Sequence, residues 1–154
     1  MSNLRVSIIS VFAVCLVLFS MLVRSEPSGA TRLEIDATVN KMQTFSAEGN
    51  MQAWATLFAE DAIFVNSALS EPVVGREAIV KMAGNWPAVE NIREWKIIEG
   101  SRMAIGWRER PVFENGRTGG WYRGISTFVF NSSGQIKKYE GVFNVLTVQA
   151  AYKQ

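Results

Sequence analysis

Residues 54–64 read WATLFAEDAIF, and within this stretch a helical pattern gives way to an extended one. Its first half carries Trp54, Leu57 and Phe58 at the spacing of one helix face. Its second half is a short apolar run that follows an aspartate, which is typical of a strand. We therefore predict a helix that ends near Phe58 and a strand over residues 62–66.

A longer helix is expected before this junction. Thr31 and Glu34 have the spacing of a capping box, in which each side chain bonds the backbone N–H of the other residue. Ile35 and Val39 then begin an apolar face that recurs at helical intervals. Gly49 can end this helix, because glycine adopts the backbone conformation that helix ends often require.

The second half of the chain is extended. A third helix is predicted over residues 76–84, and strands are predicted over residues 92–99, 102–113, 121–130 and 135–148. Helices followed by an antiparallel meander indicate an α+β domain. A strongly curved sheet wrapped over the first helix would enclose a cavity.

Composition excludes several function classes. The chain has 154 residues, with 16 Lys+Arg against 14 Asp+Glu, so it lacks the strong positive charge of a nucleic-acid-binding protein. Histidine is absent, which excludes Ser-His-Asp and Cys-His catalysis and argues against a zinc or iron site. We expect no metal and no cofactor. The single cysteine, Cys15, lies in an N-terminal apolar segment.

This N-terminal segment is predicted to direct export. Val6 to Val23 contains no charged residue and follows a short basic head, as in a signal peptide or a membrane anchor. Residues 1–30 would comprise this segment and a linker, and residues 31–154 the folded domain. The domain would be periplasmic, secreted or membrane-anchored, with residues 6–23 as its only membrane contact.

The stretch 54–64, together with GREAI at residues 75–79, resembles the opening of the SnoaL-like branch of the nuclear transport factor 2-like superfamily. Gly134-Gln135-Ile136, followed by Phe143-Asn144, is similar to the last hairpin of that branch. The resemblance implies a cone-shaped half-barrel, with three N-terminal helices packed on a strongly curved, mostly antiparallel sheet. It also implies a homodimer and a small apolar, polyketide-like or terpenoid-like ligand.

The nearest active-site pattern is that of the limonene-epoxide hydrolases, and it is degenerate in this chain. The resemblance assigns Asn66, Arg110 and Asn144 to the pocket lining. Phe64 stands where the family has a tyrosine, and Asn144 stands where it has the catalytic aspartate. Asparagine cannot accept a proton at neutral pH, so we do not expect epoxide hydrolysis.

Strand alternation suggests another acid. If Asn144 faces inward then so does Glu140, and an inward Arg110 would bring Arg108 with it. Glu140 could then act as an acid/base opposite a basic pair, or it could form a salt bridge at the rim. Trp107 is a candidate for the apolar lining.

Three functions remain open. The first is an exported domain that binds a small molecule in an apolar pocket. The second is a cofactor-free isomerase, dehydratase, cyclase or hydrolase that uses Glu140, or alternatively Glu109, as its acid/base. The third is a dimeric protein-interaction module.

Overall fold

The computed structural model describes residues 29–153. Its helices are α2 (Arg32–Ala47), α3 (Met51–Ala55), α4 (Arg76–Ala83) and α5 (Val145–Lys153). Its strands are β1 (Phe58–Asn66), β2 (Val73–Val74), β3 (Ala88–Glu99), β4 (Arg102–Val112), β5 (Tyr122–Phe130) and β6 (Ile136–Phe143). The predicted export segment lies outside the described residues. Between residues 29 and 153, no helix is long and apolar enough to cross a membrane.

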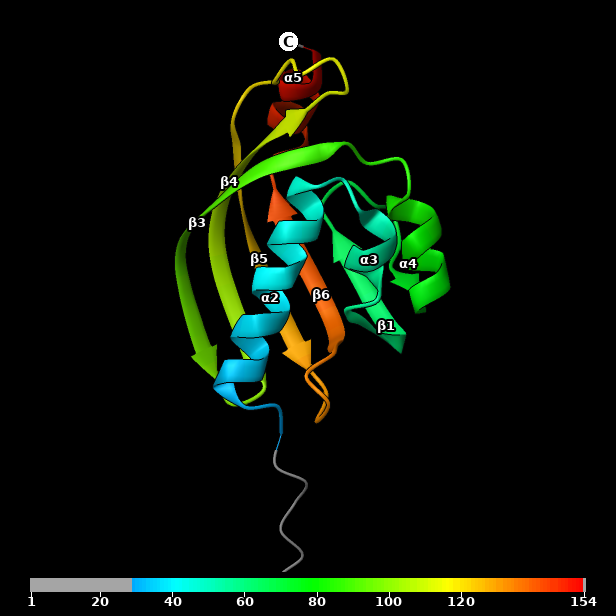
Figure 1. The fold of residues 1–154 in the computed structure, drawn as a ribbon, viewed down its shortest axis with the longest axis vertical. Coiled ribbons are helices and arrows are strands. Elements are labelled where there is room, and N and C mark those ends of the chain that lie inside the picture. The colour runs from blue at the N-terminus through cyan, green and yellow to red at the C-terminus, as the bar shows by residue number, and fades with distance from the viewer. Residues whose placement is uncertain (1–28, 154) are drawn as a thin grey trace, which may run out of the picture.

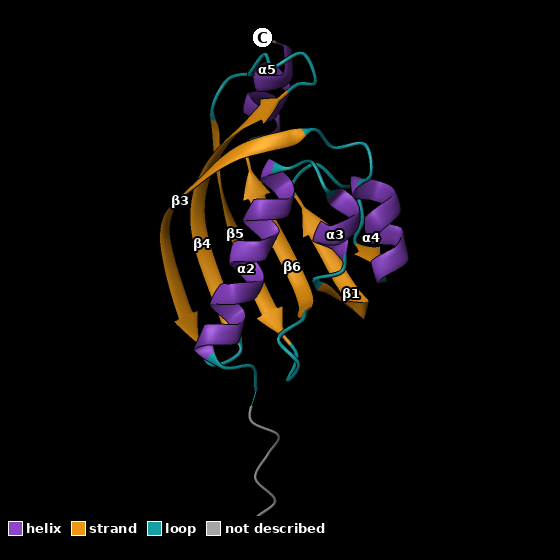
Figure 2. Cartoon of the chain, viewed as in Figure 1, coloured by secondary structure: helices purple, strands orange, loops and turns teal. Residues whose placement is uncertain are grey.

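The strands form one sheet in the order β2-β1-β6-β5-β4-β3. β1 and β6 run parallel, and every other neighbouring pair is antiparallel. The sheet is strongly curved and does not close; α2 lies across its concave face, and α3 and α4 lie beside β1 (Figure 1). Figure 2 shows α5 at one end of the sheet, beyond the upper ends of the long strands. The α+β fold with three N-terminal helices on a curved sheet is therefore confirmed.

The start of α2 follows the sequence pattern. The Thr31 backbone N–H donates to Glu34 Oε2 at 2.7 Å, and the Glu34 N–H donates to Thr31 Oγ1 at 3.3 Å, which completes the predicted capping box. Ile35, Val39 and Met42 are buried on the face that meets the sheet. This apolar face holds α2 across the concave side.

The predicted boundary near Phe58 is wrong by several residues. α3 ends at Ala55, and β1 already begins at Phe58. The reason is a long-range pairing, since Phe58 lies opposite Ile136 and the Ile136 N–H donates to the Leu57 carbonyl. Pairing with β6 thus holds this segment in a strand, although its local sequence pattern is helical.

The predicted last strand also ends early. β6 stops at Phe143, and Asn144 Oδ1 accepts from the N–H groups of Leu146 and Thr147 at 3.0 and 3.2 Å, as an N-cap does. α5 follows and packs on the loop between β4 and β5. There the Gly120 N–H donates to the Ala151 carbonyl at 3.1 Å.

Candidate functional site

A cavity of about 250 Å³ lies between α2, α5 and the concave face of the sheet. Aromatic side chains form much of its wall, namely Trp54, Phe64, Trp86, Trp107, Phe128 and Tyr139. Phe64 stacks on Tyr139 with ring centroids 4.5 Å apart, and Trp54 lies edge-on to Trp86. A cavity with such walls suits a small, mainly apolar molecule.

Glu109 supplies the carboxyl group of the cavity. Its side chain extends inward from β4, and its Oε2 accepts a hydrogen bond from the Tyr122 hydroxyl at 3.2 Å. Burial raises the pKa of Glu109 above its ordinary value, and the hydrogen bonds from Asn91 and Tyr122 offset this only in part. Within residues 29–153, no Lys or Arg forms an ion pair with Glu109. A carboxyl in this setting can exchange a proton nearer to neutral pH than an exposed glutamate.

A chain of hydrogen bonds orients the donor at Glu109. Arg93 Nη2 donates to Gln43 Oε1 at 2.5 Å, Gln43 Nε2 donates to Asn91 Oδ1 at 2.5 Å, and Asn91 Nδ2 donates to Glu109 Oε1 at 2.5 Å. A guanidinium can only donate, so Arg93 requires the Gln43 oxygen to face it. Each amide in turn has its NH₂ group directed toward Glu109.

A second polar group lies on β5 and β6. Trp107 Nε1 donates to Ser126 Oγ at 2.8 Å, and Ser126 Oγ lies 2.9 Å from the Tyr139 hydroxyl. The two hydroxyls share one hydrogen between them, so one hydroxyl hydrogen is left to donate to a molecule in the cavity. Burial raises the pKa of Tyr139 well above its ordinary value, so this donor stays neutral.

α5 closes one end of the cavity. Val148 and Tyr152 line it, and the Tyr152 ring lies 6.5 Å from the ring of Tyr122. Burial also raises the pKa of Tyr122 strongly, which keeps its hydroxyl protonated beside Glu109. The C-terminal helix therefore belongs to the site.

Three residues predicted from the sequence meet in this cavity: Phe64, Asn66 and Trp107 all line it. Phe64 is buried in the aromatic wall. Asn66 lies near the end of β1, where its Oδ1 accepts from the Ala68 N–H at 2.9 Å.

The structure does not bring Arg110 or Glu140 into the cavity. Arg110 pairs with Glu90, with Nη2 2.5 Å from Oε2, on the outer face of the sheet. Glu140 lies 3.3 Å from Lys138, also outside. The physical reason is strand alternation. Trp107 faces inward on β4, so Arg110, three positions later, faces outward. Tyr139 faces inward on β6, so the next residue, Glu140, faces outward. Arg110 and Glu140 therefore face outward, opposite to the prediction.

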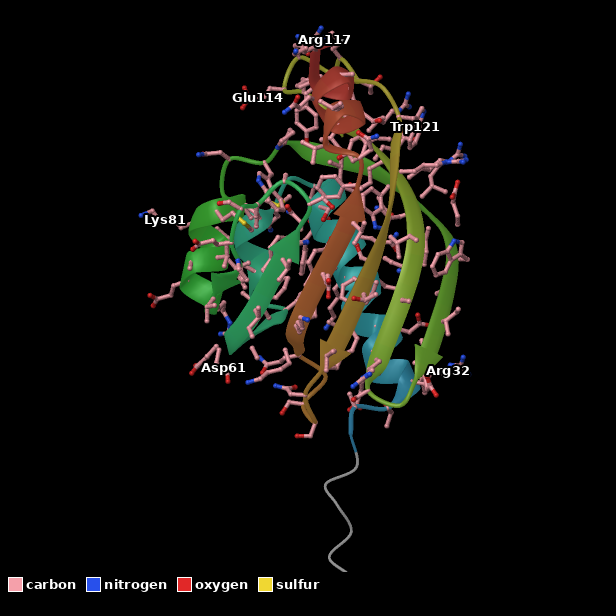
Figure 3. The ribbon with its side chains drawn as sticks, turned by 180° about the vertical axis from the view of Figure 1, so that it is seen from behind. Arg32, Asp61, Lys81, Glu114, Arg117 and Trp121 are labelled. Carbon is pink, nitrogen blue, oxygen red and sulfur yellow. The ribbon has the colours of Figure 1, made fainter. Side chains whose placement is uncertain are left out.

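Asn144 is likewise outside the cavity. β6 ends before it, and its side chain caps α5 instead of continuing the inward face of a strand. It lies in a separate hollow on the outer face, beside Arg108 and Trp121. Figure 3 views the molecule from this side and labels Trp121 near the upper end of β5.

The sequence predicts Glu109 only as the alternative to Glu140 as an acid/base. One available signal would have favoured it: Trp107 was expected inward, and a residue two positions later on a strand shares its face. Asn91, Ser126 and Tyr139 were missed because nothing in their local sequence marks them. Over residues 29–153, no group of three acidic, histidine or cysteine side chains could hold a metal ion.

Solved structures share this fold at low sequence identity. Δ5-3-ketosteroid isomerase from Mycobacterium sp. is 18% identical, with a TM-score of 0.62, over 72% of this chain and 93% of that one. A provisionally assigned isomerase from Bacillus subtilis is 18% identical, with a TM-score of 0.67, over 78% and 93%. A provisionally assigned SnoaL-like polyketide cyclase from Jannaschia sp. CCS1 is 15% identical, with a TM-score of 0.62, over 77% and 91%.

A search of curated proteins returned no significant match. In contrast, the family model of the SnoaL-like domain matches residues 39–139. This match runs from the middle of α2 into β6 and includes Glu109 and most of the cavity wall. The open, cone-like sheet is also the fold of nuclear transport factor 2-like proteins. The chain belongs to the SnoaL-like domain family.

Proposed function

We propose that the cavity binds a small, mainly apolar molecule with a carbonyl group, and that Glu109 transfers a proton on it. The observation that carries this proposal is a carboxyl group enclosed by aromatic walls, with two neutral donors and no paired cation among the described residues. The names of the structural neighbours, isomerases and a cyclase, support proton transfer as the reaction class.

The chemistry requires no cofactor. Ionised Glu109 would remove a proton from the carbon next to the carbonyl, and the electron pair of that C–H bond would move onto the carbonyl oxygen. The unshared hydroxyl hydrogen of the Ser126–Tyr139 pair could donate to this oxygen as charge develops there. Returning the proton from Glu109 to another carbon would complete an isomerisation.

A binding protein without turnover is the second candidate. Phe64 and Asn66 favour it, because both line the cavity and neither can exchange a proton at neutral pH. In that case Glu109 would only hydrogen-bond the ligand.

We further propose export and self-association as the setting of this function. The uncharged run from Val6 to Val23 supports a location outside the cytoplasm. On the outer face of the sheet, Trp95, Ile97 and Ile125 are 43%, 65% and 47% exposed, which supports burial of this face against a second copy. Cross-linking through single cysteines introduced on this face, with Cys15 replaced by serine, would test the pairing, and a protein that stays monomeric at all concentrations would oppose it.

The exchange of α-protons for deuterium tests the main proposal. Full-length protein in a non-ionic detergent would be mixed with a panel of small cyclic ketones in D₂O, and loss of the α-proton signal would be followed by NMR. We expect faster exchange than in buffer, which Glu109→Gln removes. Glu140→Gln makes the same change on the outer face and should have no effect. Saturable binding without faster exchange would favour the second candidate, and no binding would refute both.

A further inference from the structure

A second hollow lies on the outer face of the sheet and adjoins the cavity at Tyr122, which lines both. We call it the outer hollow, and it is lined by Arg108, Trp121, Tyr122, Arg123, Asn144 and Thr147. Trp121 lies at the beginning of β5 on this side (Figure 3). The acid–base chemistry proposed above uses none of its arginines.

Two positive charges face each other across the strands here. Arg108 on β4 is the direct register partner of Arg123 on β5, so both side chains leave the same face of the sheet. Like charges directly opposite each other destabilise an antiparallel pair. Such a pair persists in a fold when a neighbouring negative charge offsets the repulsion.

One carboxylate serves both arginines. Glu94 Oε1 lies 3.2 Å from Arg123 Nη2 and 3.9 Å from Arg108 Nε. The next arginine, Arg110, is held by Glu90 through both Nε and Nη2, at 2.6 and 2.5 Å. Among residues 29–153, no other carboxylate forms an ion pair with Arg108 or Arg123, so the outer hollow keeps about one uncompensated positive charge.

The unused polar groups of the hollow are hydrogen-bond donors. Arg108 Nε is buried and has no hydrogen-bond partner among the described residues. Asn144 Oδ1 already accepts from two N–H groups of α5, which leaves its NH₂ group able to donate. The guanidiniums of Arg108 and Arg110 lie 5.1 and 4.8 Å from the centre of the Trp121 ring, which restricts their motion. Hydrogen-bond donors with restricted motion, together with a surplus positive charge, favour the binding of an oxyanion.

We propose that the outer hollow binds a small oxyanion, a carboxylate or a phosphate group, between Arg108 and Arg123. One oxygen would accept from the partly exposed Arg108 guanidinium, and the Asn144 amide and the Arg123 guanidinium would hold the others. Glu94 competes with the anion for the same guanidiniums. The site would thus be selective for anions that either displace the Glu94 carboxylate or share the two guanidinium groups with it.

The test is an NMR titration of the full-length, ¹⁵N-labelled protein in a non-ionic detergent, with sodium phosphate or sodium acetate added at constant ionic strength against chloride. Saturable shifts are expected at Arg108 Nε–Hε and at the Trp121 indole N–H. Tighter binding of phosphate would identify a phosphoryl ligand, and tighter binding of acetate a carboxylate ligand.

Three variants make the test specific. Arg123→Ala, which changes a largely exposed side chain, should weaken binding at least about tenfold because one of two charge-assisted contacts is lost. Glu94→Gln should strengthen binding severalfold, since it removes the competitor. Arg102→Ala makes the same charge change near the other end of β4 and should leave binding unchanged. Shifts that do not saturate, equal losses in the two arginine variants, or no gain in Glu94→Gln would overturn the proposal.

Discussion

Asn91 Nδ2 donates a 2.5 Å hydrogen bond to Glu109 Oε1, and this contact determines how the cavity carboxyl is held. The bond joins β3 to β4, where Asn91 and Glu109 are register partners. A donor to the carboxyl stabilises its ionised form against the cost of burial. The balance between these two effects sets the pH at which Glu109 can act as a base.

Loss of this donor should make Glu109 harder to ionise. In Asn91→Leu the side chain keeps a similar volume but cannot donate, so the pKa of Glu109 should rise further above its ordinary value. The ¹³C resonance of the Glu109 carboxyl reports this titration, and Glu109→Gln identifies the resonance by its absence. An unchanged titration in Asn91→Leu would mean that the hydrogen bond contributes nothing to the ionised state.

Arg93 should act on Glu109 at a distance. Arg93→Met removes the donor that orients Gln43, so the two amides can turn over and Asn91 can direct its oxygen toward Glu109. We expect the pKa of Glu109 to rise, by less than in Asn91→Leu. Lys96→Met is the control, because Lys96 also pairs with Asp36 of α2 but has no place in the amide chain. If Arg93→Met and Lys96→Met raised the pKa of Glu109 equally, the cause would be the loss of one positive charge and not the reorientation of the amides.

The raised pKa of Glu109 predicts how stability depends on pH. Above the ordinary value of 4.5, the unfolded chain has lost this proton while the folded protein still holds it. The contribution of Glu109 is therefore fully present below that value and is lost as the pH rises through the folded-state pKa. Compared with Glu109→Gln, the wild type should lose free energy of unfolding over this range.

Urea denaturation of the two proteins at several pH values measures this difference, and the contributions of other titrating groups cancel in the subtraction. Glu140→Gln makes the same substitution on the outer face, and it controls for the replacement of a glutamate by glutamine elsewhere in the fold. A difference between wild type and Glu109→Gln that stays constant with pH would contradict the burial of a titrating carboxyl at this position.

Gly119 should be required for the position of α5. A Cβ atom at this residue would lie 2.2 Å from the Ala151 carbonyl oxygen and 2.6 Å from Pro111 Cγ. Gly119→Ala should therefore displace α5 at a cost of about 1–3 kcal/mol, as overpacking does. Gly29→Ala is the control, since its Cβ would make only an ordinary contact with Ser101 at 3.7 Å.

The same variant should weaken ligand binding, because α5 supplies Val148 and Tyr152 to the cavity wall. Urea denaturation and ketone binding measured on one sample would give both effects. Reduced stability with unchanged binding would mean that α5 contributes to the fold but not to the site.

The sequence predicts the fold better than the site. Local signals were enough for α2, where the capping box and the apolar face from Ile35 onward both appear in the structure. They failed at Phe58, because pairing with β6 overrides its helical spacing. They failed again at Asn144, where a side-chain cap ends the strand pattern.

The site depends on which way each strand faces. Trp107 and Arg110 were both expected inward, although an odd spacing on a regular strand sends them to opposite faces. If Trp107 defines the inward face of β4, Glu109 also faces inward. If Arg110 defines it, the face assigned to the cavity is in fact the outer one. The amide chain from Arg93 to Glu109 joins residues of α2, β3 and β4, and no local pattern predicts such a contact.

The central claim is that Glu109 is the proton-transfer group of the cavity. The most direct measurement is the pH dependence of ketone α-proton exchange, compared with the titration of the Glu109 carboxyl followed by NMR in the same protein. We predict that the exchange rate above buffer rises as Glu109 ionises, and that Glu109→Gln stays at the rate of buffer at every pH. Wild-type exchange in Glu109→Gln, or a rate that does not follow the titration, would contradict the claim.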